Sequence, residues 1–225
     1  MKKNIHTGRL IIAVDGPAGS GKSTASRLLA EKLSYRYIDT GAMYRAAAVA
    51  AHLAGVSTDD DAALEQLMKE VDISFVSGRI HLNGEDVSRA IREPEIDGLS
   101  SAVSARAPIR AALIALQRRM AEKGSVVMEG RDIGTVVLPD ADIKFFVTAS
   151  TEVRGRRRYT ERIMRGEQAN LREVIEAIER RDERDAQREL SPLVPANDAE
   201  VIDTSMMNLE EVVDCMMEKV KKYGI

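Results

Sequence analysis

Residues 16–24 read Gly16-Pro17-Ala18-Gly19-Ser20-Gly21-Lys22-Ser23-Thr24. They fit the pattern G-x-x-x-x-G-K-[ST], in which glycines let the backbone turn tightly and aim its N–H groups at phosphate oxygens. In that pattern Lys22 reaches the β- and γ-phosphates of a nucleoside triphosphate, and Ser23 places its hydroxyl on Mg²⁺, partly through water. We therefore expect these residues to form a loop that binds triphosphates.

The sequence on both sides of this loop supports the interpretation. The apolar run at residues 10–14 is typical of a buried parallel strand. Residues 22–33 carry apolar side chains at helical spacing, so the loop would precede a helix N-terminus, where the helix dipole favours anions. Motors, switches, kinases and helicases share such a loop, so the loop alone does not identify the reaction.

Composition narrows the class of protein. The chain has 225 residues, of which 44% are hydrophobic and 31% charged, which is ordinary for a soluble globular domain. A net charge of −3 favours neither nucleic acid nor an anionic membrane as a partner. The single cysteine, Cys215, excludes an internal disulfide, and no stretch approaches 18 apolar residues. We expect a cytoplasmic protein, and a monomer because no long unpaired apolar stripe demands a partner.

Strands and helices alternate along most of the chain. Such alternation predicts an α/β fold with a parallel, doubly wound sheet flanked by helices. Short strands are expected at 35–39, 125–129, 143–147 and 201–202. Helices are expected at 40–53, from Thr58 or Asp59 to about 70, and at 108–123, 151–165, 170–189 and 209–222. Asn208 and Glu211 form a capping box for the last of these.

One region interrupts the alternation. Residues 72–76 and 79–82 alternate apolar and polar side chains, and Asn83-Gly84 is a hairpin signal. Helical residues follow from Pro94 to about Arg106. We predict that residues 72–106 form a small α+β insert, and that residues 1–71 and 107–225 form the core.

Two polar segments follow predicted strands, where ligands gather in α/β sheets. The first, residues 39–45, offers a phenol at Tyr44 and a guanidinium at Arg45, although a helix cap followed by a surface arginine explains it equally well. The second is Glu129-Gly130-Arg131-Asp132, in which a carboxylate can orient Mg²⁺ or its waters and Arg131 can fork onto a phosphate.

Two charged helices contain many arginines. Six arginines lie in residues 154–165, opposed only by Glu152 and Glu161. In the next helix Arg181, Asp185 and Arg188 share one face and could grip a phosphorylated sugar. Salt bridges on a solvated helix are the alternative.

Several strings together resemble the bacterial cytidylate kinase family of nucleoside monophosphate kinases. They are the glycine-rich loop, residues 38–45, residues 130–141, Arg181-Asp182-Glu183-Arg184-Asp185, and Ser191-Pro192-Leu193-Val194-Pro195-Ala196. The resemblance covers residues 9–222 and implies a P-loop core with an NMP-binding insert and a helical lid at about 151–170. It implies transfer of the γ-phosphoryl group of ATP to CMP or dCMP, giving ADP and CDP or dCDP, with Mg²⁺.

The resemblance also assigns roles to matching residues. Gly16 to Thr24 would hold the ATP phosphates. The residues matched to CMP are Thr40, Arg110 and Asp132 at the base with Tyr44 beside them, Arg45, Arg131 and Arg188 at the phosphate, and Ser101, Arg181 and Asp185 at the pentose. Lys22, Arg131, Arg157 and Arg188 would be catalytic, Arg157 being one of the lid arginines at 154–158. Family members commonly have aspartate where this chain has Glu129, which puts a direct contact between residue 129 and a Mg²⁺-bound water in question.

Elementary chemistry agrees with such a reaction. The attacking phosphate oxygen of CMP is already anionic at pH 7, so positioning and charge neutralisation suffice without a general base. A kinase acting on a metabolite hydroxyl remains an alternative, but it would need a base that the sequence does not single out. An ATP-dependent nucleic-acid module is another, which the arginines favour and the acidic total disfavours. A GTPase is disfavoured because an Asn-Lys-x-Asp string is absent.

Overall fold

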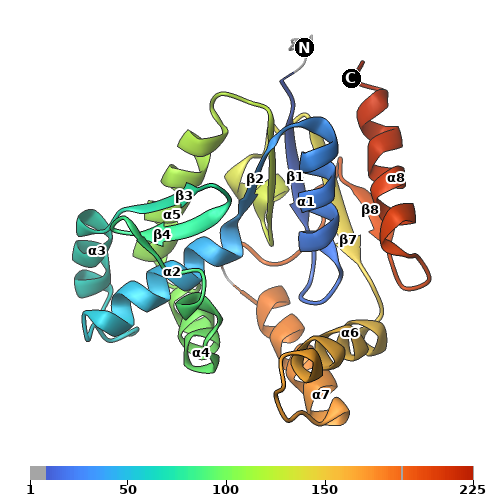
Figure 1. Cartoon of the computed structure of the whole chain (residues 1–225). Coiled ribbons are helices and arrows are strands. Elements are labelled where there is room, and N and C mark those ends of the chain that lie inside the picture. Colours follow the sequence, from blue (N-terminus) through green and yellow to red (C-terminus); the bar gives the residue numbers. More distant parts are fainter. Residues whose placement is uncertain (1–8, 189, 225) are drawn as a thin grey trace. The chain divides into compact units, whose positions relative to one another are not determined.

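The structure is a computed structural model that describes residues 9–188 and 190–224. These residues form two compact units (Figure 1). Unit 1 comprises the described residues up to Tyr37 and those from Lys123 onward, and unit 2 comprises Ile38–Glu122. The predicted insert, residues 72–106, lies inside unit 2, which also contains helices before and after it. Its boundaries stay a prediction.

A parallel sheet organises unit 1, with strand order β2-β6-β1-β7-β8. The strands are β1 (Ile11–Asp15), β2 (Arg36–Asp39), β6 (Val126–Gly130), β7 (Ile143–Thr148) and β8 (Glu200–Asp203). The last two residues of β2 are counted in unit 2. In the central strand, Val14 pairs with Glu129 on one side and Phe145 on the other. Strand β1 is almost fully buried, as its apolar run predicts. The predicted parallel sheet flanked by helices is thus confirmed.

Four α-helices belong to unit 1. They are α1 (Lys22–Leu33), α6 (Thr151–Met164), α7 (Leu171–Ala186) and α8 (Leu209–Lys221). Leu29 of α1 and Met216 of α8 pack with Ile12 and Phe145 of the sheet in one buried cluster. The predicted capping box of α8 is present, and a single π-helical turn, η2 (Ile133–Val137), follows β6.

Unit 2 contains helices and a small antiparallel sheet. The helices are α2 (Thr40–Leu53), α3 (Asp61–Glu70), the 3₁₀ turn η1 (Ala90–Arg92), α4 (Pro94–Val103) and α5 (Ala107–Ala121). The sheet has the order β3 (Ile73–Val76), β4 (Arg79–Leu82), β5 (Glu85–Asp86). Both of its turns, Ser77-Gly78 and Asn83-Gly84, have two residues with positive φ, the conformation that tight hairpins require.

Three expected boundaries were wrong. Helix α3 is capped by Asp60, whose carboxylate accepts from the Ala63 N–H at 3.0 Å, and not by Thr58 or Asp59. Helix α4 ends at Val103, because Arg106 takes an extended conformation as the N-cap of α5. Helix α7 ends at Ala186, so Arg188 lies beyond the helix.

Within residues 9–188 and 190–224, no single helix is both long and apolar enough to span a membrane. Helices α4 and α5 satisfy that test only as a pair, with a bend of 94° between them.

Candidate active site

The glycine-rich loop joins β1 to α1 through backbone conformations that favour glycine. Gly16, Gly19 and Gly21 all have positive φ, which favours glycine. A Cβ on Gly16 would lie 2.0 Å from the carbonyl oxygen of Val147, so no larger residue fits there. Gly21 is the N-cap of α1 and brings no side chain to that position, which leaves the positive end of the helix dipole for an anion.

Lys22 and Ser23 lie at the start of α1 and have defined partners. The Nζ of Lys22 donates to the carbonyl oxygen of Pro17 at 3.1 Å, within the loop itself. The hydroxyl of Ser23 donates to Oε2 of Glu129 at 2.9 Å. The carboxylate near the end of β6 therefore touches the serine that the motif assigns to Mg²⁺.

A buried carboxylate connects β1 with the segment after β6. Asp15 accepts hydrogen bonds from the backbone N–H of Ile133 at 2.8 Å and of Gly134 at 2.7 Å. Burial raises the pKa of Asp15 to about 6, the two backbone N–H groups oppose that rise, Asp132 adds to it, and Lys22 opposes it. Asp15 thereby fixes the backbone that follows Arg131 and Asp132.

A second buried carboxylate of unit 1, that of Asp185, lies near the end of α7. Asp185 is buried, and its two oxygens bind Nε of Arg131 at 3.2 Å and Nη2 of Arg188 at 2.6 Å. One carboxylate thus gathers two guanidinium groups at the end of β6, a strand adjacent to β1 and its loop. Arg181 lies on α7 one turn before Asp185, and Asp132 is buried.

Two arginines of the predicted lid contact the P-loop backbone. Arg154 donates to the carbonyl oxygen of Ala18 at 3.3 Å and pairs with Asp182 at 2.6 Å. Arg157 donates to the carbonyl oxygen of Ser20 at 3.2 Å and, through Nη2, to that of Thr204 at 2.8 Å. The N-terminal part of α6 is therefore attached to the loop. A role for Arg157 at the transferring phosphate stays a prediction.

The remaining predicted residues lie in unit 2. Asp39 caps α2 by accepting from the Ala42 N–H at 2.9 Å, and it pairs with Arg45 at 3.4 Å. The guanidinium of Arg110 lies over the ring of Tyr44, 5.9 Å from its centroid. Thr40 is buried at the start of α2, and Ser101 lies on α4. The structure thus brings Tyr44 and Arg110 together, and gives Asp39 the capping role that the sequence had left open.

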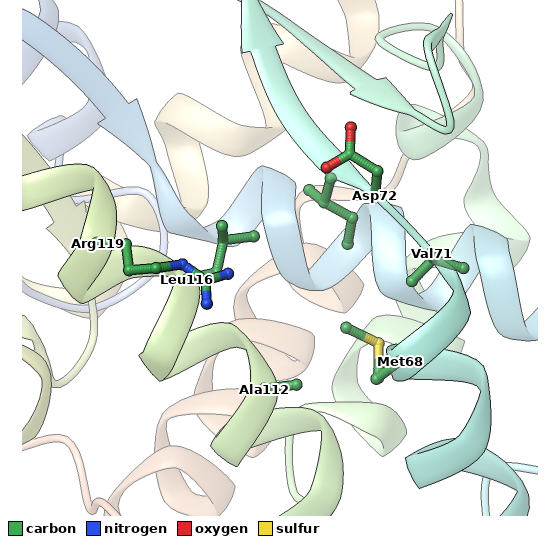
Figure 2. A pocket seen from close by; sticks show the side chains of 7 residues that line it. Met68, Val71, Asp72, Ala112, Leu116 and Arg119 are labelled. Atoms are coloured by element: carbon green, nitrogen blue, oxygen red, sulfur yellow. The ribbon is translucent and has the colours of Figure 1, made fainter.

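Unit 2 also contains a small cavity that holds none of the predicted site residues. Its volume is about 90 Å³. Figure 2 shows side chains of α3 and α5 turned toward it. The lining residues are Met68, Val71, Asp72, Ile73, Ala112, Leu116 and Arg119. This cavity is much smaller than typical ligand pockets of about 300–1,000 Å³, so it suggests no substrate site.

Sequence reasoning missed three residues of unit 1 that hold the site together. Asp15 directly follows the apolar run at residues 10–14, which was a usable signal. Tyr37 donates its hydroxyl to Oε1 of Glu129 at 2.6 Å, and Thr204 donates to the carbonyl oxygen of Ser20 at 2.9 Å. No local pattern marks these two, because their partners are 92 and 184 positions away.

The parallel sheet flanked by helices, with the glycine-rich loop between β1 and α1, has the fold of P-loop kinases. Two solved structures share the fold. They are an uncharacterized protein from Eubacterium ventriosum, with a TM-score of 0.52, and shikimate kinase from Bacteroides thetaiotaomicron, with a TM-score of 0.50. Both are 15% identical to this chain; they cover 95% and 93% of it, and 99% and 97% of their own chains align.

Sequence relatives identify the family. The family model described as cytidylate kinase matches residues 12–222. Cytidylate kinase from Geobacter sp. strain M21 is 52% identical over 95% of this chain and 93% of its own, and that from Bacillus subtilis is 45% identical over 95% and 97%. The chain belongs to the cytidylate kinase family. It is therefore an ATP-dependent kinase that phosphorylates CMP or dCMP. This replaces the two alternatives considered from the sequence, a kinase of metabolite hydroxyls and an ATP-dependent nucleic-acid module.

Proposed function

We propose that unit 1 supplies the ATP-binding loop of this reaction. It would also supply the Glu129 carboxylate beside the proposed Mg²⁺ site, and Arg131 and Arg188. The observation that carries the proposal is the cluster of Arg131, Asp185 and Arg188, in which Arg131 directly follows β6, the strand next to β1 and its loop. Two guanidinium groups held by one carboxylate suit a phosphate that must be gripped from more than one direction. Lys22 and Arg157 would add charge neutralisation at the transferring phosphoryl group.

Mg²⁺ fits the residues beside the loop. The hydroxyl of Ser23 and the carboxylate of Glu129 are oxygen donors only 2.9 Å apart, and Mg²⁺ is usually held by one or two protein oxygens together with phosphates and water. Ser23 would contact the ion, and Glu129 would orient its waters. The ion would offset charge on the β- and γ-phosphates.

Recognition of cytosine is proposed for Asp132 and Arg110. Cytosine offers an N4 amino donor and an N3 acceptor, whereas uracil reverses both. Asp132 would accept from N4, and Arg110 would donate to N3. Thr40, Tyr44, Arg45, Ser101 and Arg181 complete the proposed CMP-binding set.

We further propose that the protein is a cytoplasmic monomer, as expected from the sequence.

Asp132→Ala tests the proposed base recognition. We expect kcat/KM for CMP to fall by about 10- to 100-fold, because a buried polar contact to the base is lost. Stability should change little, since Asp132 raises the pKa of its neighbour Asp15 and its removal relieves that repulsion. Asp140→Ala, which removes an exposed carboxylate nearby in the sequence, is the control. Unchanged kcat/KM in Asp132→Ala would contradict the role.

A further inference from the structure

Glu129 is held at both of its oxygens by hydroxyl groups from different elements. Tyr37 of β2 donates to Oε1 at 2.6 Å, and Ser23 of α1 donates to Oε2 at 2.9 Å. Glu129 itself is the penultimate residue of β6 and is 2% exposed. We call these residues the Tyr37–Glu129–Ser23 chain.

The ring of Tyr37 has a second contact that fixes it. The guanidinium of Arg27, on α1, lies 5.5 Å from the ring centroid. The phenol is thus held by α1 through its ring and donates to β6 through its oxygen. This leaves the hydroxyl little freedom to turn away from Glu129.

We propose that Tyr37 is a positioning residue. It holds the carboxylate of Glu129 in place, and Glu129 in turn orients the Ser23 hydroxyl at the proposed Mg²⁺ site of the P-loop. A glutamate has three side-chain torsions, so a hydrogen bond to one oxygen selects among its conformers. The other oxygen then accepts the hydrogen bond from the Ser23 hydroxyl, which leaves the lone pairs of the serine oxygen directed elsewhere and available to a cation. Tyr37 acts only through Glu129.

The Tyr37–Glu129–Ser23 chain also explains how a glutamate at position 129 can contact both hydroxyl groups. Both oxygens are used at hydrogen-bonding distance, so the length of the side chain is matched to Tyr37 and Ser23. Aspartate is shorter by one C–C bond of about 1.5 Å, so it would lose at least one of the two contacts unless the backbone moved. The inference rests on the proposed Mg²⁺ role of Ser23 and Glu129.

The test measures how much Mg²⁺ strengthens binding of a non-hydrolysable ATP analogue. We compare the intact protein, Tyr37→Phe and Tyr35→Phe by fluorescence titration with and without Mg²⁺. Tyr37→Phe should reduce the strengthening by Mg²⁺ about fivefold to tenfold, as expected for loss of a hydrogen bond to a charged group, and leave Mg²⁺-free binding within about twofold. Tyr35→Phe is the matched control, because the Tyr35 hydroxyl instead accepts from the Leu10 N–H.

A double substitution separates positioning from a general structural effect. In a Glu129→Ala background, Tyr37→Phe should change the Mg²⁺ effect by less than about twofold, because the carboxylate that it holds is gone. An undiminished Mg²⁺ effect in Tyr37→Phe would overturn the proposal, as would equal losses with and without Mg²⁺ or a full loss in the Glu129→Ala background. If the intact protein itself bound the analogue no more tightly with Mg²⁺, the proposed metal role would fail, and this inference with it.

Discussion

Asp15 carries a buried charge between two segments that are 118 positions apart in the chain. Its two backbone hydrogen bonds recover only part of the cost of burial, so its pKa lies near 6 where an ordinary aspartate lies near 3.8. The folded state therefore binds a proton more readily than the unfolded chain between these two pH values. The contribution of Asp15 to the free energy of unfolding is fully present below the pKa of the unfolded chain, near 3.8. It is lost as the pH rises through about 6.

Asp15→Asn should remove this pH dependence. In the intact protein, loss of the Asp15 proton as the pH rises from 5 to 7.5 should by itself lower the free energy of unfolding by about 1–2 kcal/mol. The variant should lack that component, whatever its absolute stability. Urea unfolding at the two pH values measures the difference. The same change with pH in both proteins would show that Asp15 does not titrate as proposed.

Asp185 combines a structural and a kinetic role, because it holds Arg131 and Arg188. Asp185→Ala should lower the free energy of unfolding by about 1–3 kcal/mol, which is less than for a fully buried pair because both arginines are partly exposed. It should also lower kcat/KM for CMP by about tenfold or more, since the arginines lose their alignment. Urea unfolding and steady-state kinetics measure the two effects.

Glu176→Gln is the control for Asp185→Ala, since Glu176 forms only exposed pairs with Arg172 and Arg180 on the same helix. It should change stability by less than about 0.5 kcal/mol. Normal CMP kinetics in a destabilised Asp185→Ala protein would reduce Asp185 to a structural salt bridge.

Among the elements, α6 and α7 pack closely at a glycine. A Cβ on Gly155 would lie 2.4 Å from Cγ1 of Ile175, so the two helices approach each other only because residue 155 lacks a side chain. Gly155→Ala should cost about 1–3 kcal/mol through overpacking, despite the better helix propensity of alanine. Urea unfolding, with limited proteolysis of residues 151–186, measures the effect.

Gly98→Ala provides the comparison, because a Cβ on Gly98 of α4 meets no atom within 4 Å. There the same substitution should leave stability unchanged or raise it by up to about 1 kcal/mol. If Gly155→Ala behaved like Gly98→Ala, the close approach of α6 and α7 would not matter energetically.

Element types followed from the sequence because periodicity and capping are local. The apolar run of β1, the spacing in α1 and the Asn208–Glu211 capping box all predicted what the structure contains. Boundaries that depend on competition between neighbours were less predictable. Asp60 outcompetes Asp59 as the cap of α3, and Arg106 ends one helix by capping the next.

At the scale of the whole molecule, motifs predicted the candidate site but not the contacts that hold it together. The phosphate loop and the Arg131–Asp132 segment were visible because glycine, lysine and arginine at fixed spacing have a specific chemistry. The partners of Asp15 and Glu129 were not visible, because hydrogen bonds across 92 to 119 positions depend on how the strands align. The predicted CMP residues are divided between the units, with Arg131, Asp132, Arg181, Asp185 and Arg188 in unit 1 and the others in unit 2.

The most direct test of the account is a coupled assay of ADP release with CMP, dCMP, UMP, AMP, GMP and TMP as acceptors. We predict that CMP or dCMP has the highest kcat/KM, at least about tenfold above every other base, because a wrong base leaves polar groups of the protein unpaired. A higher kcat/KM for any non-cytidine monophosphate, or ADP release that no monophosphate stimulates, would contradict the account.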